Sequence, residues 1–420
     1  MKILKICFLS ILSLIGSISY AQKITSEEIK YSYSRLPMIA LNKSIKNYMV
    51  TFEASYEAKN EALLKEYKEA RLAEADRYKK EMALYPGLLK AAQENYEKEL
   101  AEYNKKSFGK KLLEKQLLEE STKPVKILPP KPYLNEIEKP ILQSSYDYKV
   151  LASTYLKLEG YQNAPSNALK ITVLLYGFDY TQPRTIDVQE SRISTGTTSP
   201  TNTYKATLYH TEFSYRHPMA IKVTAPDGKE LLSITPPELN LYKIYKSPNT
   251  DRGLTINRDL LVKNMEEKVL QDNLTYINNL LNDRFGFSSP SRTAKIFFVK
   301  KGGDEYADLT TAFNEVSAAL PMLQQDSNTA KEKLDKACST WNTALSQSDM
   351  NNKKARIDKD ITLGICSNLL EAYFATGNVR EGKALLDKMS SFSLSFTERK
   401  MKNDFEALFT DLKTRQQNNL

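Results

Sequence analysis

Histidine, glycine and cysteine are scarce in this chain of 420 residues. The sequence contains 2 histidines, 14 glycines and 3 cysteines. Histidine and cysteine are the usual ligands of zinc, and glycine-rich loops cradle the phosphates of nucleotides, so little material exists for either kind of site. No HExxH, GxSxG, GxGxxG or P-loop motif is present. We therefore expect no metal, no cofactor, no catalytic residue and no enzyme activity.

Long apolar runs and clusters of positive charge are also missing from most of the chain. No run of 18 apolar residues follows the first 21 residues, so we expect no integral membrane insertion. The formal net charge is +9, but lysine and glutamate alternate instead of forming a basic patch. Nucleic-acid binding requires such a patch, so we expect no nucleic-acid partner. Hydrophobic residues make up 41% of the chain, which indicates globular domains and excludes wholesale disorder.

The N-terminus has the organisation of a secretory signal peptide. Two lysines, an apolar segment and small residues follow one another: Lys2, Lys5, 6–15, Ser19 and Ala21. This pattern predicts cleavage between Ala21 and Gln22, and therefore export to a periplasm, a cell surface or the medium. Cys7 lies inside the apolar segment and lacks the small-residue context of a lipoprotein cleavage site. We therefore expect no lipid anchor.

Two cysteines, Cys338 and Cys366, remain after the predicted cleavage. An oxidising compartment would permit a disulfide between them. Both cysteines fall in helical patterns. The sequence allows only this one pairing but does not give the distance between the two residues, so two buried free thiols are the alternative. The sequence therefore leaves this pair as a candidate disulfide.

The residue patterns predict an α+β fold built from several parts. We expect a small antiparallel β body, a long helical hairpin inserted into it and an all-helical C-terminal domain. The expected boundaries are 1–21 for the signal peptide, 22–52 for strands joining the β body, 53–122 for the hairpin, 123–144 for a proline-rich connector, 145–305 for a β-rich domain with one amphipathic helix, and 306–420 for the helical domain.

Residues 53–120 are rich in alanine, leucine, glutamate and lysine, which favour a helix. Three tyrosines recur every 11 residues and so share one helix face: Tyr56, Tyr67 and Tyr78. Pro86 disfavours a helical residue before it and Gly87 permits a turn. We therefore expect an antiparallel, coiled-coil-like hairpin that turns there, with the tyrosines packed between its arms. A single kinked helix is the alternative. The proline-rich segment 123–144 predicts a stiff, extended connector back to the β body.

Residues 145–235 contain short alternating apolar segments and turns, which predict a small antiparallel sheet. An amphipathic helix follows at 256–283, and we expect the strand 295–300 to return to this β body. The two histidines of the chain, His210 and His217, lie seven residues apart in this region. No cysteine or carboxylate cluster accompanies them, so we expect them at surface or edge positions and not in a metal site.

Five helical segments are predicted in the C-terminal region: 306–323, 328–347, 354–376, 379–390 and 396–416. One helix pair among them has apolar, aromatic and small residues at characteristic positions: Leu369, Tyr373, Gly377, Gly382 and Leu386. This arrangement resembles a tetratricopeptide repeat, in which Gly382 stands where alanine is usual and no proline closes the unit. Residues 328–345 resemble the second helix of a preceding repeat, so the resemblance covers about 325–393.

The resemblance implies a concave surface that binds a protein or peptide. On that basis we place a candidate partner-binding surface on this helix pair, at Tyr373, Asn368 and Arg380. A helical cap packed on the β body, without any binding role, is the alternative. A protein partner is therefore an expectation that rests on the resemblance.

These patterns together predict an exported, non-catalytic interaction or scaffold protein of a bacterial-type cell envelope. It would bind a protein partner through the tetratricopeptide-like end, the helical hairpin or both. One alternative is a periplasmic chaperone-like assembly factor, since a β body with a projecting helical hairpin is similar in outline to such chaperones. The other is a carbohydrate-binding surface protein, in which tyrosines of the β domain would stack on a glycan.

Overall fold

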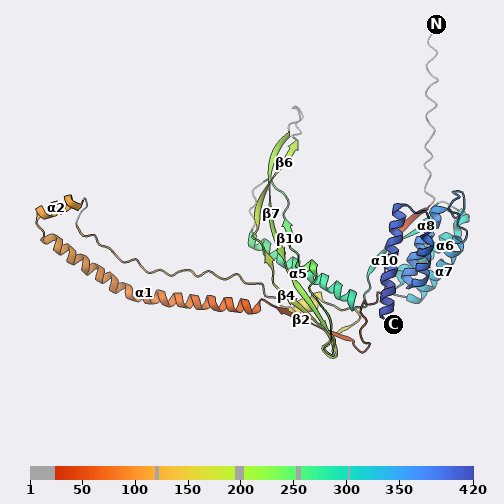
Figure 1. The fold of residues 1–420 in the computed structure, drawn as a ribbon, viewed down its shortest axis with the longest axis horizontal. Coiled ribbons are helices and arrows are strands. Elements are labelled where there is room, and N and C mark those ends of the chain that lie inside the picture. Colours follow the sequence, from red (N-terminus) through yellow and green to blue (C-terminus); the bar gives the residue numbers. More distant parts are fainter. Residues whose placement is uncertain (1–23, 119–122, 194–202, 252–256, 301–302) are drawn as a thin grey trace, which may run out of the picture.

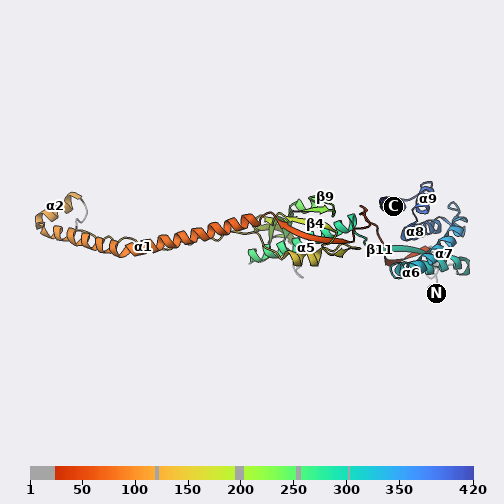
Figure 2. The same cartoon turned by 90° about the horizontal axis from the view of Figure 1, so that it is seen from below.

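The computed structural model describes residues 24–118, 123–193, 203–251, 257–300 and 303–420. The chain forms three parts in a row, which are a long arm, a β body and a C-terminal helical domain (Figure 1, Figure 2). The predicted α+β class is confirmed. The predicted signal peptide, with its cleavage site at Ala21 and Gln22, lies outside the described residues. Export and final location therefore stay predictions.

A five-stranded sheet forms the centre of the β body. Its strands, in the order β3-β2-β4-β8-β9, are β3 (Gln162–Asn163), β2 (Asn47–Ala54), β4 (Ala168–Leu175), β8 (Met219–Thr224) and β9 (Glu230–Ile234). β2 runs parallel to β3 and β4, with Val50 opposite Ile171, whereas the other pairs are antiparallel. The sheet is therefore mixed, and the prediction of a purely antiparallel body is wrong here. The arm is inserted between β2 and β4, and such a long connection allows neighbouring strands to run parallel.

A second sheet of the β body is antiparallel and is built around one long strand. The central strand β7 (Thr203–Arg216) pairs with β5 (Asp179–Tyr180), β6 (Arg184–Ile193) and β10 (Lys243–Lys246). The hairpin of β6 and β7 projects from the body in Figure 1. Two short helices complete the connections, α3 (Tyr148–Tyr155) and α4 (Pro237–Asn240).

The helix α5 (Arg258–Arg284) supplies the other half of the core of the β body. Leu274 and Ile277 of α5 are fully buried in the same cluster as Ile171 and Val173 of β4. The side chain of Asn257 caps the helix by accepting the backbone N–H of Leu260. The amphipathic helix predicted at 256–283 is thus confirmed. Its apolar face packs against the five-stranded sheet.

The arm consists of one continuous helix and an extended return. The helix α1 (Glu57–Lys105) has 49 residues, about 73 Å at 1.5 Å per residue, and it runs through Pro86. The predicted hairpin turn at Pro86 and Gly87 is therefore wrong, and the single helix named as the alternative is the one that forms. No residue of α1 is buried. Water can therefore bond the carbonyl group that the proline leaves unpaired, so the cost of keeping a proline inside this helix is reduced.

The return segment, residues 123–147, runs back along α1 after the short helix α2 (Phe108–Leu118) at the tip of the arm (Figure 1). Its contacts follow an antiparallel order: Asn60 Nδ2 to the Gln143 carbonyl at 2.9 Å, Glu74 Oε1 to the Asn135 N–H at 2.6 Å, Arg77 Nη2 to the Tyr133 carbonyl at 3.0 Å, and Tyr85 Oη to the Pro129 carbonyl at 3.4 Å. Prolines stabilise an extended chain that needs no strand partner. Tyr85 therefore contacts an extended segment where the sequence led us to expect a second helix.

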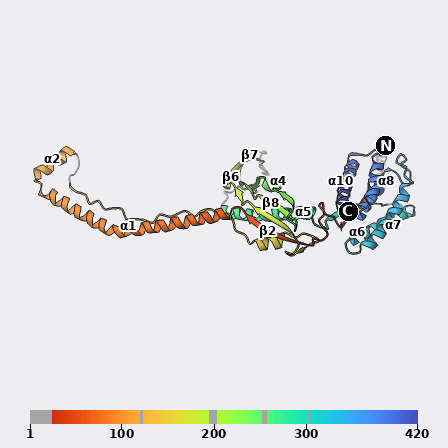
Figure 3. The ribbon, with the colours of Figure 1, turned by 60° about the horizontal axis from the view of Figure 1, so that its bottom comes forward.

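The helical domain contains five helices, α6 (Ala307–Met322), α7 (Ser327–Leu345), α8 (Lys359–Thr376), α9 (Val379–Met389) and α10 (Phe396–Asn418), after a 3-10 turn, η1 (Gly303–Tyr306). They confirm the five segments predicted from the sequence. Local signals explain their ends: Asp358 caps the start of α8, Gly377 ends it with a φ of 77°, and Ser395 with Glu398 forms a capping box at the start of α10. Figure 3 places this domain at the end of the molecule opposite the arm tip.

A two-stranded ribbon belongs to the helical domain and not to the β body. β1 (Ile24–Ser32) pairs antiparallel with β11 (Ser291–Val299) and with no other described strand. The predictions that the first strand of 22–52 and the strand 295–300 join the β body are therefore wrong, although β2 does join it. The reason is the face that the ribbon buries: Ile29, Tyr31 and Ile296 lie in one apolar cluster with α6 and α8. A strand pattern predicts that one face is buried but not by which partner.

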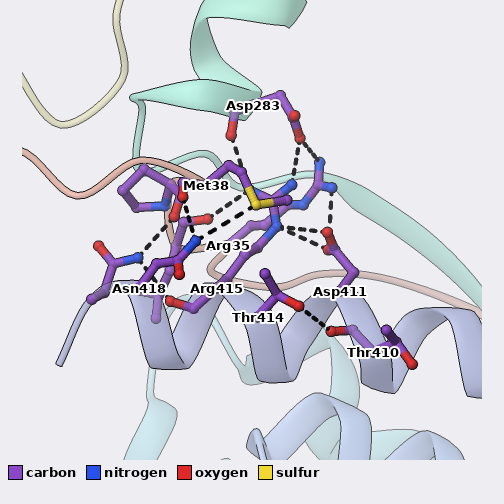
Figure 4. Close-up of polar contacts among 11 residues, drawn as sticks. Arg35, Met38, Asp283, Thr410, Asp411, Thr414, Arg415 and Asn418 are labelled. Atoms are coloured by element: carbon purple, nitrogen blue, oxygen red, sulfur yellow. Dashed lines mark hydrogen bonds and ion pairs between the residues drawn. The ribbon is translucent and has the colours of Figure 1, made fainter. Parts of the chain in front are cut away.

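Arg415 of α10 ties the helical domain to the β body. Its side chain is 2% exposed, and its guanidinium donates to the carbonyl oxygens of Leu36 at 2.8 Å and Asp283 at 2.9 Å. The same group pairs with the carboxylates of Asp283, in the last turn of α5, and Asp411, at 2.6 and 2.9 Å. Arg35 contacts both of these carboxylates as well, at 2.8 and 3.3 Å (Figure 4). Two arginines and two aspartates therefore form the joint between the two parts.

Replacing both arginines of this joint, Arg35→Ala with Arg415→Ala, is expected to loosen the joint while each part stays folded. The loss of charge-assisted hydrogen bonds weakens the attachment of α10 to α5, but the apolar cores of the two parts do not include these residues. The distance distribution between spin labels on α5 and α7 should broaden. The exposed Arg380, which pairs with its neighbour Glu381, serves as the control through Arg380→Ala. An unchanged distribution in the double variant would refute the joint.

Candidate functional site

A groove of about 1060 Å³ lies between β11, α8 and α10 in the helical domain. We call this feature the groove. Its apolar walls come from all the surrounding elements: Ile24, Phe297, Leu363, Met401, Phe405 and Leu408. Concave sites of this size with mostly apolar walls and a few polar groups are typical ligand sites. The groove is therefore the candidate functional site of the chain.

The floor of the groove is α8, which is the central helix of the domain. All residues from Ile361 to Phe374 are buried, so other elements surround this helix along most of its length, and the groove lies over its face at Leu363 and Ser367. Gly364 explains how the ribbon comes so close to it. A Cβ atom at this position would lie 2.3 Å from Cδ1 of Ile24 and 3.1 Å from Cβ of Phe297. The glycine therefore allows the ribbon to lie directly against the helix.

A buried ion pair stands at the deep side of the groove. Arg292 of β11 donates from Nε and Nη2 to the two carboxylate oxygens of Glu371, at 2.6 and 2.9 Å. The phenol of Tyr31 donates to Glu371 Oε1 at 2.5 Å, and burial together with this carboxylate raises the pKa of Tyr31. The guanidinium also lies over the rings of Phe374 and Phe405, 5.2 and 5.6 Å from their centroids. This network fixes β1, β11, α8 and α10 around the groove.

The outer edge of β11 is open along the groove. Asn368 of α8 accepts the N–H of Phe297 and donates to its carbonyl, both at 2.8 Å, so these main-chain groups point away from β1. Every second residue of an antiparallel strand has the same orientation, so the N–H and C=O groups of Thr293 and Lys295 also point away from β1. Both residues line the groove. Among the described residues, none forms a hydrogen bond to these groups.

The three residues predicted to bind a partner do not form one surface. Asn368 is 1% exposed and is occupied by β11. Tyr373 is 8% exposed, and its hydroxyl accepts a hydrogen bond from Asn342 at 2.9 Å. Arg380 is on the outside of α9, where it pairs with Glu381. Two of the three therefore support the structure from inside, and the prediction of a binding surface at these positions is wrong.

The helix pair α8–α9 agrees with the resemblance in its local details. Gly377 forms the turn, Leu369 and Leu386 are buried, and Gly382 lies at the crossing with α10, where a Cβ would be 2.2 Å from the ring of Phe409. The ribbon, however, covers the side of α8 at Gly364, whereas a solenoid of repeats would leave a concave surface open. A repeat architecture therefore stays a prediction.

The two remaining cysteines are free and buried. Cys338 on α7 is 7% exposed and Cys366 on α8 is fully buried, and they are not bonded to each other. Burial raises the pKa of both thiols to about 12. Since the thiolate is the reactive form, neither cysteine has the character of a nucleophile. The candidate disulfide is thus not formed, and the alternative of two buried thiols is what the structure has.

Both histidines are buried, so the prediction of surface or edge positions is wrong. His210 is 6% exposed, and its Nε2 lies 3.5 Å from Glu212 Oε2. His217 is 1% exposed and is packed near the rings of Tyr146 and Phe178. Neither ring nitrogen of His217 has a hydrogen-bond partner within the described part of the chain. In that part, no group of three His, Cys, Asp or Glu residues is arranged to hold a metal ion.

His217 is expected to make the β body less stable in mild acid. Burial lowers its pKa to about 4, whereas the unfolded chain has the ordinary value of about 6.5. Between these values only the unfolded state takes up the proton, so the free energy of unfolding falls by about 2 kcal/mol from pH 7 to pH 5. Urea unfolding followed by the near-ultraviolet circular dichroism of tyrosine should detect this loss. His217→Leu should remove it, and an equal loss in both proteins would contradict the assignment.

Comparison with known proteins provides no relative from which a role could be transferred: no family model, no curated protein and no solved structure matches this chain.

Proposed function

We propose that this chain is an exported, non-catalytic interaction protein of a cell envelope, which binds an extended segment of a protein partner in the groove. The observation that carries the proposal is the open edge of β11 beside an apolar wall. A peptide placed there would gain main-chain hydrogen bonds from Thr293 and Lys295, as in strand addition at other sheet edges. Its alternate side chains would enter the groove between Leu363 and Met401.

Two features favour a peptide over a small substrate. The groove, at about 1060 Å³, is at the upper end of the range for small-molecule sites. Its deepest charged groups, Arg292 and Glu371, are bonded to each other and to Tyr31, so their role is to hold the surrounding elements together. What remains for recognition is the main chain of β11, the apolar side chains and the other charged residues that line the groove, among them Lys295, Lys400 and Asp404. A site of this kind accepts a range of sequences, which suits a scaffold or adaptor.

The proposal is tested by selecting short random peptides that bind the purified chain. We expect selected peptides to have apolar residues at alternate positions. Met401→Asp, which puts a charge into the groove, should abolish their binding. The control is Phe396→Asp, on the same helix, where the side chain is 77% exposed and lies outside the groove.

Strand addition has its own test, because a proline at Thr293 removes only an N–H that faces the groove. Thr293→Pro should weaken the selected peptides by about tenfold, the equivalent of one or two hydrogen bonds. Lys30 lies opposite Thr293 in the ribbon, so its N–H is on the other edge and Lys30→Pro is the matched control. Equal effects of the two prolines would contradict strand addition.

The two alternatives predict different results in the same experiments. A chaperone-like factor would bind unfolded chains through the groove without any preference among peptides. A carbohydrate-binding protein would yield no peptide and would instead bind members of a glycan array. Either result would replace the proposal of a specific protein partner.

A further inference from the structure

The tip of the arm is the described part of the chain that lies farthest from the helical domain (Figure 2). It comprises residues 105–113, which are the last residue of α1 and the first part of the short helix α2 with the turn between them. The helix α1 has no buried residue along its 49 residues, so the arm has no core of its own and acts as a spacer of about 73 Å. A structure of this kind places its tip where another surface can be reached.

Large apolar side chains are exposed on α2. Phe108 is 81% exposed, Leu113 is 60% exposed and Leu112 is 50% exposed. Phe108 and Leu112 are four residues apart and share a helix face, and Leu113 lies about 100° farther around the helix. None of the three belongs to either apolar core of the protein. Their exposure in water is unfavourable, and it is relieved only when another surface covers them.

The charge of the tip differs from that of the rest of the arm. Along α1, lysines stand four residues before glutamates, as in the pairs Lys65–Glu69 and Lys90–Glu94. From 105 to 113 the chain instead contains four lysines and no acidic residue: Lys105, Lys106, Lys110 and Lys111. This segment therefore has a formal charge of +4 next to the exposed apolar side chains.

We propose that the arm tip, residues 105–113, docks on the surface of an anionic lipid bilayer. Lysines attract the negatively charged headgroups, while the phenylalanine and the leucines enter the boundary between headgroups and acyl chains. No described helix is long and apolar enough to cross a bilayer. A nucleic acid would satisfy the lysines but leave the apolar side chains exposed. A helix that binds in a cleft of a partner protein presents its apolar residues along one narrow stripe. The apolar residues of α2 are instead spread over a wide part of its circumference.

Docking at the tip would leave the groove available at the other end of the molecule. The arm, the β body and the helical domain follow one another in both views of the fold (Figure 1, Figure 2). A bilayer that holds α2 would therefore keep the groove on the far side of the β body. The chain would act as a spacer between a membrane and whatever the groove binds, and the membrane contact does not depend on the identity of that partner.

The test is flotation of the whole chain with lipid vesicles in a density gradient. We expect the chain to float with vesicles that contain phosphatidylglycerol, and to float much less with vesicles of phosphatidylcholine alone. Added salt should weaken the binding, because it screens the lysines. Equal binding to both kinds of vesicle, or to neither, would overturn the proposal.

Two sets of variants locate the contact. The triple variant Phe108→Ser, Leu112→Ser and Leu113→Ser should lose at least about tenfold in affinity for the anionic vesicles. The control is the triple variant Leu72→Ser, Leu84→Ser and Leu88→Ser, which removes leucines of similar exposure from the shaft of the arm and should bind as the unchanged protein does. Circular dichroism of both variants checks that the helices of the arm stay formed, because serine is a poorer helix former than leucine. Equal binding by the two variants would overturn the assignment to the tip.

Discussion

Replacing Glu371 with alanine is expected to lower the free energy of unfolding of the helical domain by about 3–5 kcal/mol, since one partner of a buried ion pair is removed. The carboxylate is 2% exposed and accepts hydrogen bonds from Arg292 and Tyr31. Without it, a cation that is three-quarters buried has lost its partner. Arg292 is held over the rings of Phe374 and Phe405 and is 25% exposed, so it keeps only partial contact with water when the carboxylate is removed.

The measurement is urea unfolding followed by the fluorescence of Trp341. This residue is the single tryptophan of the chain and is 1% exposed on α7, so it reports on the helical domain alone. Glu371→Gln keeps an acceptor for Tyr31 and should lose less stability than Glu371→Ala. Glu381→Ala removes an exposed ion pair from α9 and should leave the unfolding midpoint almost unchanged. A loss below about 1 kcal/mol in Glu371→Ala would show that the network does not hold the domain.

A second large effect is expected at Gly382, where α9 crosses α10. A Cβ atom at this position would lie 2.2 Å from Cε1 and Cζ of Phe409, a ring that is fully buried and packed edge-on against Phe374. Gly382→Leu should therefore force the helices apart and cost about 3 kcal/mol or more. Gly382→Ala should also destabilise the helical domain. This is expected even though alanine is the better helix former by about 1 kcal/mol and is the usual residue at this position of a tetratricopeptide repeat.

The control for Gly382 is another glycine inside a helix. A Cβ atom at Gly87 of α1 would have no neighbour within 4 Å, so Gly87→Ala should leave the protein as stable as before or slightly more stable. The fluorescence of Trp341 during urea unfolding again reports the loss at Gly382, and helical circular dichroism reports the effect at Gly87. If Gly382→Ala raised stability as Gly87→Ala does, the close crossing of α9 and α10 would be refuted.

The local elements were predictable because their signals are local. The apolar stripe of α5, the cap at Asp358, the turn at Gly377 and the capping box at Ser395 act within a few residues of chain. The C-terminal helices therefore begin and end close to the predicted positions. Pro86 is the exception, because the rule that proline ends a helix assumes that the lost hydrogen bond is costly, and in the solvated α1 that cost is small.

The residues of the candidate site were less predictable, because their surroundings come from distant parts of the chain. Asn368 and Glu371 are polar residues in an otherwise largely apolar part of α8. Their position there is the one sign in the sequence that these two side chains have specific partners. Their partners, Phe297, Arg292 and Tyr31, are separated from them by 71, 79 and 340 residues. No pattern along α8 identifies such partners, so exposed binding residues and buried supporting residues look alike from the sequence.

By itself, the sequence determined the α+β class, the five C-terminal helices, the amphipathic helix α5 and the existence of a long helical arm. Only the tertiary structure decided that β1 pairs with β11, that the predicted proline-rich connector lies against α1 on its way back to the β body, and that the groove opens beside β11. The physical reason is the range of the interactions. Helix caps and apolar periodicity depend on neighbours in the chain, whereas strand pairing and grooves depend on which distant surfaces bury each other best.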